Sequence, residues 1–232
     1  MITFKNLKKS YGKNVVLDID LLEIPKGQAF GLVGNNGAGK TTMFSCLLDL
    51  IKPTKGIVTN NEINVRESED WKTFSSAYLD ESFLIGYLMP EEYFYFIGEL
   101  RNVKQKEVYE FLKQFEDLFN GEILGGKKYI RDLSKGNQKK VGIVAALIGS
   151  PSVIILDEPF ANLDPTTQIR LKKIIKKLST YNRVTVLISS HDLQDVTEVS
   201  ERIVLLEKGK IIKDIKTSEK TLKELESYFT KE

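Results

Sequence analysis

Short apolar runs bounded by turns alternate along this chain with segments whose apolar residues recur every three or four positions. The apolar runs lie at residues 29–33, 153–157, 183–189 and 202–207. Such runs are typical of strands buried on both faces of a parallel sheet, with helical segments between them as crossovers. The pattern therefore predicts an α/β core.

The clearest helical pattern follows Pro165, the expected first residue of a helix whose N-cap is Asp164. Apolar residues at 171, 174, 175 and 178 share one face of this helix, and lysines stand at 172, 173, 176 and 177. We expect these lysines to form a solvated face rather than a basic patch that binds a partner.

The same patterns divide the chain into three parts. Strand-like segments and turns reach to about residue 63, helical patterns fill 82–149, and the α/β alternation resumes after Pro151. In order, the expected later elements are helices near 93–100, at 104–118 and at 139–148, a hairpin at 207–214 and an amphipathic helix at 218–229. This order predicts a β-rich start, an inserted helical part and a core built from both ends of the chain.

Composition narrows the classes of function. The 232 residues suffice for one large domain with an insert, and a net charge of +2 gives no reason to expect nucleic acid as a partner. The single cysteine, Cys46, cannot form an internal disulfide and is expected to be a small buried apolar residue in a reducing cytoplasm. The start of the chain lacks the apolar core of a signal peptide, and no window reaches the roughly 18 apolar residues of a membrane span.

Residues 34–42 read GNNGAGKTT and fit the phosphate-binding pattern G-x-x-x-x-G-K-[ST] at every fixed position. The glycines let successive backbone N–H groups turn toward phosphate oxygens. Lys40 would add a mobile positive charge and Thr41 a hydroxyl for magnesium, while a helix at 41–51 would point its N-terminus at the same phosphates. A chance glycine-rich turn is the alternative, but the expected strand before it and helix after it favour the motif. The absence of a G-x-G-x-x-G fingerprint disfavours NAD.

A second signal is the run VIILDE at 153–158, a buried strand that ends in two carboxylates. Ligands of open α/β sheets gather at that end of the strands. Asp157 is placed to hold magnesium, directly or through water, and Glu158 to accept a proton from an attacking water. The alternative is that the two acids only cap the helix that follows.

The segment LSKGNQ at 133–138 lies between these two motifs. Taken alone it is a helix start in which Ser134 or Asn137 caps free N–H groups. In this order it resembles the LSGGQ signature of the ATP-binding cassette (ABC) family, from which Lys135 and Asn137 depart. The resemblance covers nearly the whole chain.

The resemblance gives roles to three further residues. Tyr11 stands where the family has an aromatic residue that stacks on adenine, and Asp164 belongs to ANLD, which resembles the family's D-loop. His191 follows the next strand, where the family places a histidine that contacts the γ-phosphate. It is the only histidine of the chain. A lone histidine is more often structural, yet this order favours a functional one.

One position departs from the family. A glutamine normally ends the strand that leads into the helical insert and links the metal to the transmembrane partner, whereas this chain has Glu81. A glutamate occurs there in some lantibiotic-type exporters of the family. The alternative is an alignment shifted by one residue, with Asp80 or Glu81 simply exposed. The apolar and aromatic run that follows, at 83–97, is expected to form mostly insert core and in part a groove for a short helix of a membrane partner.

The resemblance implies an α/β P-loop NTPase: one nucleotide-binding domain over 1–232, with a RecA-like core and antiparallel β subdomain from 1–80 and 151–232 and a helical subdomain at about 82–150 that ends in the signature helix. It implies ATP and Mg²⁺. The implied nucleotide-binding residues are Tyr11, Gly34, Asn35, Asn36, Gly37, Ala38, Gly39, Lys40, Thr41, Thr42, Ser134, Gly136 and Asp164. The implied catalytic residues are Lys40, Glu158 and His191, and the implied metal ligands are Thr41, Asp157 and Glu81.

The function implied is that of an ATPase subunit that pairs head to tail with a second copy and drives an integral membrane permease from the cytoplasmic face of the cell membrane. The chain resembles exporters more than importers in its short single cassette, in the sequence of its phosphate loop and in the lack of a long C-terminal extension. The alternative is a soluble ABC ATPase, for example one of iron–sulfur assembly. A third class, a nucleotide sensor that does not hydrolyse ATP, is disfavoured by Glu158 and His191.

Overall fold

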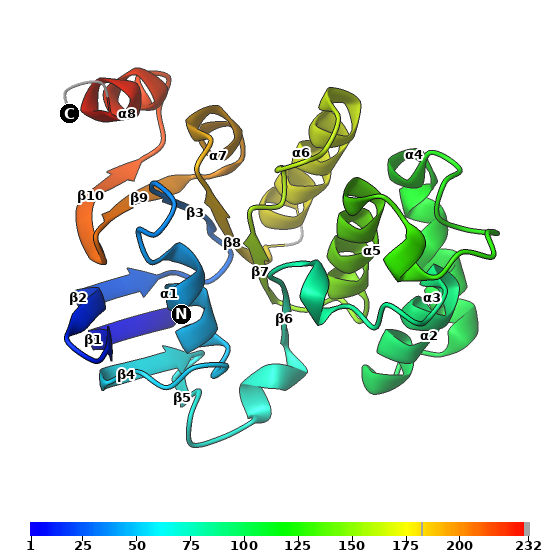
Figure 1. Ribbon diagram of the computed structural model, residues 1–232, viewed down its shortest axis with the longest axis horizontal. Coiled ribbons are helices and arrows are strands. Elements are labelled where there is room, and N and C mark those ends of the chain that lie inside the picture. Colours follow the sequence, from blue (N-terminus) through cyan, green and yellow to red (C-terminus); the bar gives the residue numbers. More distant parts are fainter. Residues whose placement is uncertain (182, 230–232) are drawn as a thin grey trace.

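The computed structural model describes residues 1–181 and 183–229 of the chain. Within them, an antiparallel sheet near the N-terminus adjoins a larger, mostly parallel sheet, and a group of helices lies on the other side of that sheet (Figure 1). This arrangement confirms the expected α/β class with an N-terminal antiparallel part and an inserted helical part.

The antiparallel sheet has the strand order β2-β1-β4-β5. Its strands are β1 (Ile2–Tyr11), β2 (Asn14–Ile24), β4 (Lys55–Asn60) and β5 (Ile63–Asn64). Buried and more exposed positions alternate along much of β1 and β2, which is the pattern of strands with one face on a core.

The larger sheet has the order β10-β9-β3-β8-β7-β6, in which only β10 is antiparallel to its neighbour. Its strands are β3 (Ala29–Val33), β6 (Ser75–Tyr78), β7 (Val153–Asp157), β8 (Thr185–Ser190), β9 (Arg202–Glu207) and β10 (Lys210–Lys216). Three of the four expected parallel strands match these bounds. The strand expected from 183 begins instead at Thr185, because Arg183 takes a left-handed conformation with φ of 52°.

The helices follow the predicted order, with corrected ends. Their bounds are α1 (Lys40–Leu47), α2 (Pro90–Leu100), α3 (Gln105–Leu112), α4 (Glu116–Phe119), α5 (Lys135–Leu147), α6 (Pro165–Thr180), α7 (Leu193–Val199) and α8 (Thr221–Phe229). The helix expected at 41–51 ends early, since Asp49 is left-handed with φ of 51°. No helix in the described ranges is both long and apolar enough to cross a membrane.

The single helix expected over 104–118 is wrong. A 3₁₀ turn at Lys113–Phe115 separates α3 from α4. This tighter turn arranges three aromatic rings in series, with centroids 5.0 Å apart for Phe111 and Phe115 and 6.3 Å apart for Phe115 and Phe119. Aromatic contact and burial of Phe115 therefore override the continuous helical pattern.

The large sheet separates two apolar cores. Ile154 and Leu156 of β7 face a core shared with helices α2 to α6, whereas Val153 and Ile155 face a core shared with α1 and the antiparallel sheet. This alternation follows from the two-residue period of a strand. Cys46 lies fully buried in the second core, where burial raises the pKa of its thiol to about 11, as expected for a structural cysteine.

The lysine face of α6 needs one correction. The side chain of Lys172 is only 13% exposed, and its Nζ lies 2.8 Å from Asp195 Oδ1 and 2.9 Å from Glu198 Oε2 of α7. Lys173, Lys176 and Lys177 do lie on an intermediate or exposed face. The helical pattern could not reveal that α7 crosses this face.

Candidate nucleotide-binding and hydrolysis site

The carboxyl ends of β3, β7 and β8 meet at one edge of the sheet and carry the sequence motifs. Val33 pairs with Ser190 and Asp157 pairs with Ser189, so the phosphate loop, the pair Asp157–Glu158 and His191 leave the sheet side by side. Parallel pairing thus assembles segments that are more than a hundred residues apart.

The phosphate loop joins β3 to α1, and its glycines are required by geometry. Gly37 and Gly39 are left-handed, with φ of 82° and 109°. A Cβ on Gly34 would lie 2.2 Å from the carbonyl oxygen of Leu206, and one on Gly39 would lie 2.8 Å from a methyl group of Leu17. Side chains at these positions would displace the loop from the sheet, so the curled, amide-rich backbone depends on glycine.

Lys40 begins α1 and is 6% exposed. Its Nζ donates to the carbonyl oxygen of Gly34 at 2.7 Å and lies 3.3 Å from Glu158 Oε1. The ammonium therefore spans the loop and joins it to the acidic end of β7. A phosphate that entered the loop would meet this charge together with the N-terminus of α1.

Thr41 and Asp157 meet directly, since Thr41 Oγ1 donates to Asp157 Oδ2 at 2.5 Å. The hydroxyl of Ser189 donates to the other carboxylate oxygen. Burial raises the pKa of Asp157, and the hydrogen bonds from Ser189 and Thr41 oppose that rise. A hydroxyl and a carboxylate suit Mg²⁺, which takes hard oxygen ligands and completes its shell with phosphates and water. The residues present fit that ion.

Glu158 makes polar contacts through both its carboxylate and its backbone N–H. Its carboxylate lies 3.3 Å from Lys40 Nζ and 2.8 Å from His191 Nδ1, and the backbone N–H of His191 also donates to it at 3.3 Å. Its own N–H donates to Ser189 Oγ at 3.0 Å, and its φ of 47° is left-handed. Lys40, Glu158 and His191 thus form a continuous polar chain beside the phosphate loop. Such a carboxylate can accept a proton from water.

The signature segment begins α5 and adjoins the start of α6. Ser134 caps α5 by accepting from the N–H of Asn137 at 3.2 Å, which settles the choice between Ser134 and Asn137. A Cβ on Gly136 would lie 3.2 Å from the carbonyl oxygen of Asn162, so the signature touches the ANLD segment. Asp164 caps α6 by accepting from the Thr167 hydroxyl at 2.5 Å and from the Thr167 N–H at 3.0 Å. The bond from the hydroxyl, followed by the bond from the N–H, lowers the pKa of Asp164.

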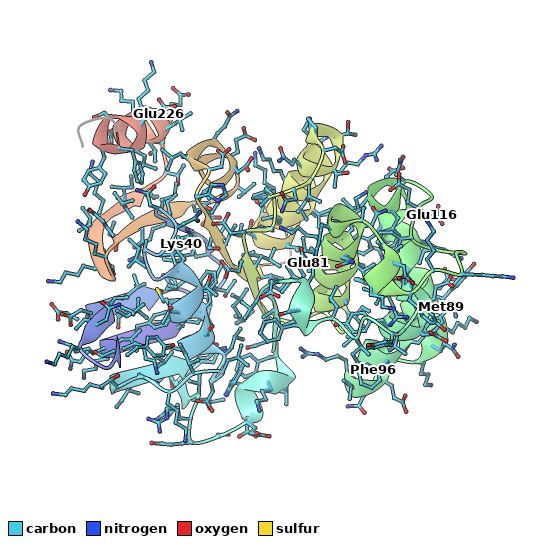
Figure 2. The ribbon with its side chains drawn as sticks, viewed as in Figure 1. Lys40, Glu81, Met89, Phe96, Glu116 and Glu226 are labelled. Carbon is cyan, nitrogen blue, oxygen red and sulfur yellow. The ribbon has the colours of Figure 1, made fainter. Side chains whose placement is uncertain are left out.

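Two predicted residues lie apart from this cluster. Tyr11 ends β1, is 55% exposed, and has the Nζ of Lys9 4.6 Å from its ring centroid. Glu81 follows β6 where the sheet meets the helical insert (Figure 2). Tyr78 donates a hydrogen bond to Glu81 Oε1 at 2.9 Å. Within the described ranges, no three His, Cys, Asp or Glu side chains converge as metal ligands. The roles of Tyr11 and Glu81 stay predictions.

The remaining predicted residues belong to the loop and its helix. Asn35 and Asn36 are exposed, Ala38 is buried with its N–H bonded to the carbonyl oxygen of Asn35 at 3.0 Å, and Thr42 is half-buried on α1.

Three side chains of the site were not predicted. Ser189 bridges Asp157 and Glu158, Tyr78 holds Glu81, and Lys139 donates to backbone carbonyls of the segment after β7. Ser189 ends the apolar run at 183–189, two residues before His191, so its position at the end of a buried strand was an available signal. Tyr78 and Lys139 act through contacts that their own sequence surroundings do not indicate.

Comparison with known proteins agrees with this geometry. The pattern that defines the ABC transporter family matches residues 17–161. The uncharacterized ABC transporter ATP-binding protein YhaQ of Bacillus subtilis is 34% identical over 94% of this chain and 74% of its own length. The bacitracin transport ATP-binding protein BcrA of Enterococcus faecalis is 32% identical over 94% of this chain and 70% of its own length.

A solved dimer of the ATP-binding cassette MJ0796, in a post-hydrolysis state bound to ADP and Pi, superposes with a TM-score of 0.80 at 27% identity. The match covers 94% of this chain and 99% of that one. Family pattern, sequence relatives and fold therefore agree with the order of motifs at the sheet edge. The chain belongs to the ABC transporter family, as an ATP-binding subunit with the ATPase fold and motifs of that family.

Proposed function

We propose that this chain hydrolyses ATP as one of two cassettes that pair head to tail and drive a membrane-embedded exporter. The observation that carries the proposal is the carboxylate of Glu158, held between Lys40 and His191 beside the phosphate loop. One chain contributes a phosphate loop and a base to one ATP, and a signature segment to the other.

Each residue of the cluster has a role in that reaction. The loop amides and Lys40 bind the phosphates, Glu158 accepts the proton of the attacking water, and His191 orients Glu158 and faces the γ-phosphate. Thr41 and Asp157 would hold Mg²⁺, which neutralises charge on the β- and γ-phosphates when it is bound. Glu81 would act at the edge of the same site.

The signature end of α5 is open to a second copy. Ser134 is exposed, while most of α5 from Gln138 onward is buried in the chain's own fold. We therefore assign Ser134 and Gly136 to the ATP bound by the partner, with Asp164 next to the same interface. The dimer reported for MJ0796 supports this pairing.

A groove of about 340 Å³ supports a membrane partner. It lies between the end of α1, β6 and the helices α2 and α5, and is lined mainly by apolar side chains that include Leu50, Phe83 and Leu100. Phe83 is 57% exposed and Leu100 64% exposed, whereas Phe94 of α2 lies fully in the core. We assign this groove to a short helix of the permease, on the cytoplasmic face of the membrane.

Export is favoured over import by the relative BcrA, whose name gives bacitracin transport, and by the glutamate at position 81, which resembles some lantibiotic exporters. A soluble ABC ATPase outside transport is the alternative. We assign binding of the transported molecule to the permease.

The substitution Glu158→Gln tests the assignment of the base. It keeps the size of the side chain and one acceptor oxygen but removes the negative charge and the capacity to accept a proton. We expect kcat for ATP hydrolysis to fall by roughly a hundredfold or more, with ATP still bound. ATP should then hold the variant as a dimer in size-exclusion chromatography, whereas the wild-type protein returns to monomer as ATP is consumed.

Glu110→Gln serves as control, because Glu110 is exposed on α3 and forms an ion pair with Lys113 of the next turn. It should hydrolyse ATP like the wild type. Unchanged hydrolysis by Glu158→Gln would refute the assigned base. In cells that express the chain with its permease and are challenged with bacitracin or a lantibiotic, Glu158→Gln should abolish resistance. If the wild-type chain instead co-purifies only with soluble assembly proteins, the proposed role in transport is refuted.

A further inference from the structure

We infer that Lys139 is a positioning residue that fixes the segment carrying the base Glu158 to the helix whose start carries Ser134. The inference rests on the proposed function, because it concerns how two positions in the first half of α5 serve two ATP sites.

Lys139 lies in the first half of α5 and is 5% exposed. Its Nζ donates to the carbonyl oxygen of Glu158 at 2.8 Å and to that of Ala161 at 2.9 Å. One buried ammonium thus holds both ends of the turn at 158–161, which leads from β7 to the ANLD segment. Hydrogen bonds from a charged donor are about twice as strong as neutral ones.

The peptide groups around Glu158 are consequently fixed from two directions. Ser189 of β8 accepts from the N–H of Glu158 at 3.0 Å, and Lys139 of α5 binds its carbonyl oxygen. Glu158 is left-handed, with φ of 47°, a conformation that is unfavourable for a residue with a side chain. The two bonds compensate for this strain and set the direction in which the carboxylate leaves the backbone, toward Lys40 and His191.

The charges around Lys139 indicate that this residue serves the hydrolysis site and not only the stability of the fold. Burial lowers the pKa of Lys139, and the nearby charges of Glu81, Glu158 and Asp157 act against that decrease. Two of these carboxylates, Asp157 and Glu158, belong to the cluster beside the phosphate loop. The ammonium therefore lies within the field of the hydrolysis site while its hydrogen bonds go to the backbone.

Lys139 follows Ser134 by five residues on one helix, which is roughly 7.5 Å at 1.5 Å per residue. In the proposed dimer, Ser134 would touch the ATP of the partner while Lys139 holds the base for the chain's own ATP. A shift of α5 at one site would therefore move the base at the other. This makes Lys139 a link between the two hydrolysis events.

The test compares Lys139→Gln with Lys139→Arg and with Lys172→Gln. Lys172 is the matched control, since it is another nearly buried lysine that bonds to two acceptors, but on α6 and α7. We expect Lys139→Gln to lower kcat by roughly tenfold to a hundredfold, with ATP affinity and KM within about twofold of wild type, because a misplaced base affects the chemical step. The Hill coefficient for ATP should fall toward 1.

Lys139→Arg keeps the charge and the donors and should restore most of kcat, whereas Lys172→Gln should lower thermal stability without changing kcat. Hydrogen exchange of the amides at 158–163 should become faster in Lys139→Gln and stay unchanged in Lys172→Gln. Hydrogen exchange can be measured without ATPase activity. If Lys139→Gln does not fold, the same measurement is made on Lys139→Arg.

The inference is overturned if Lys139→Gln loses stability as Lys172→Gln does, with unchanged kcat and unchanged exchange at 158–163. It is equally overturned if all kinetic loss appears in ATP affinity. Failure of the proposed function is a separate result, because there the wild-type protein itself would hydrolyse no ATP.

Discussion

Tyr78 shows how a single side chain can serve packing and the site together. Its ring is 3% exposed and packs on Gly142 of α5, where an added Cβ would lie 2.3 Å from ring carbons. Its hydroxyl donates to Glu81 at 2.9 Å. Burial, followed by the bond to Glu81, raises the pKa of Tyr78 far above its ordinary value, so the hydroxyl keeps its proton as a donor. The ring and the hydroxyl can be tested separately.

The substitution Tyr78→Phe removes only the hydroxyl. We expect the free energy of unfolding to fall by about 1 kcal/mol, because a half-buried bond to a carboxylate is lost while the packing on Gly142 remains. Urea denaturation measures this change. Gly142→Ala should cost more, about 1–3 kcal/mol, because its methyl group has no space against the ring.

A double variant, Tyr78→Phe with Glu81→Gln, should lose less than the sum of the two single losses, since both remove the same bond. Full additivity would show that the hydroxyl and Glu81 do not interact in solution.

At the scale of elements, one lysine bridges α6 and α7. Lys172 lies between Asp195 and Glu198, and burial lowers the pKa of its ammonium less than the hydrogen bonds to those two carboxylates raise it. The folded pKa is therefore above the unfolded value of about 10.4. The stability gained from this shift is fully present below the unfolded pKa and is lost as pH rises through the folded pKa.

Thermal melts between about pH 9 and 11.5 should thus show that the Tm of the wild type falls as pH rises. The Tm of Lys172→Met should fall less over the same range. At neutral pH the Met variant should be less stable by about 1 kcal/mol. A variant with the same slope as the wild type over this range would show that Lys172 does not titrate with its partners.

Elements were predictable from the sequence wherever a local pattern determined them. The strands β3, β7 and β9, the N-cap Asp164 and the phosphate loop follow from residues adjacent in the chain. The break between α3 and α4 did not, because it depends on aromatic rings that meet only after folding. The same limit applies to Lys139, Tyr78 and Lys172, whose partners lie on other elements.

At the scale of the whole molecule, the proposed dimer divides each site between two chains. Lys40→Ala removes a phosphate contact within a chain, and Ser134→Asp places a negative charge where the partner's ATP would lie. Each variant alone should hydrolyse little ATP. In a mixed dimer, the Ser134→Asp chain keeps its Lys40 and meets an intact Ser134 of the other chain, which leaves one complete site.

Mixing the two variants in equal amounts should therefore restore activity, to about a quarter of the wild-type level, because about half of the dimers are mixed and each has one of two sites. An ATPase assay over the mixing ratio measures this. The control is Ser134→Asp mixed with itself at the same total concentration. No recovery on mixing would contradict sites shared between chains.

The core on the helical side of the large sheet also limits how cassettes can be recombined. Ile154, Leu156 and Ile188 of the sheet belong to the same apolar cluster as Phe94, Phe119 and Val144 of the helices. A helical insert taken from a relative to fit a new permease would arrive with side chains shaped for another sheet. The smallest unit that can be exchanged between transporters is therefore the insert together with the facing residues of β7 and β8, although these residues do not line the groove that we assign to a permease.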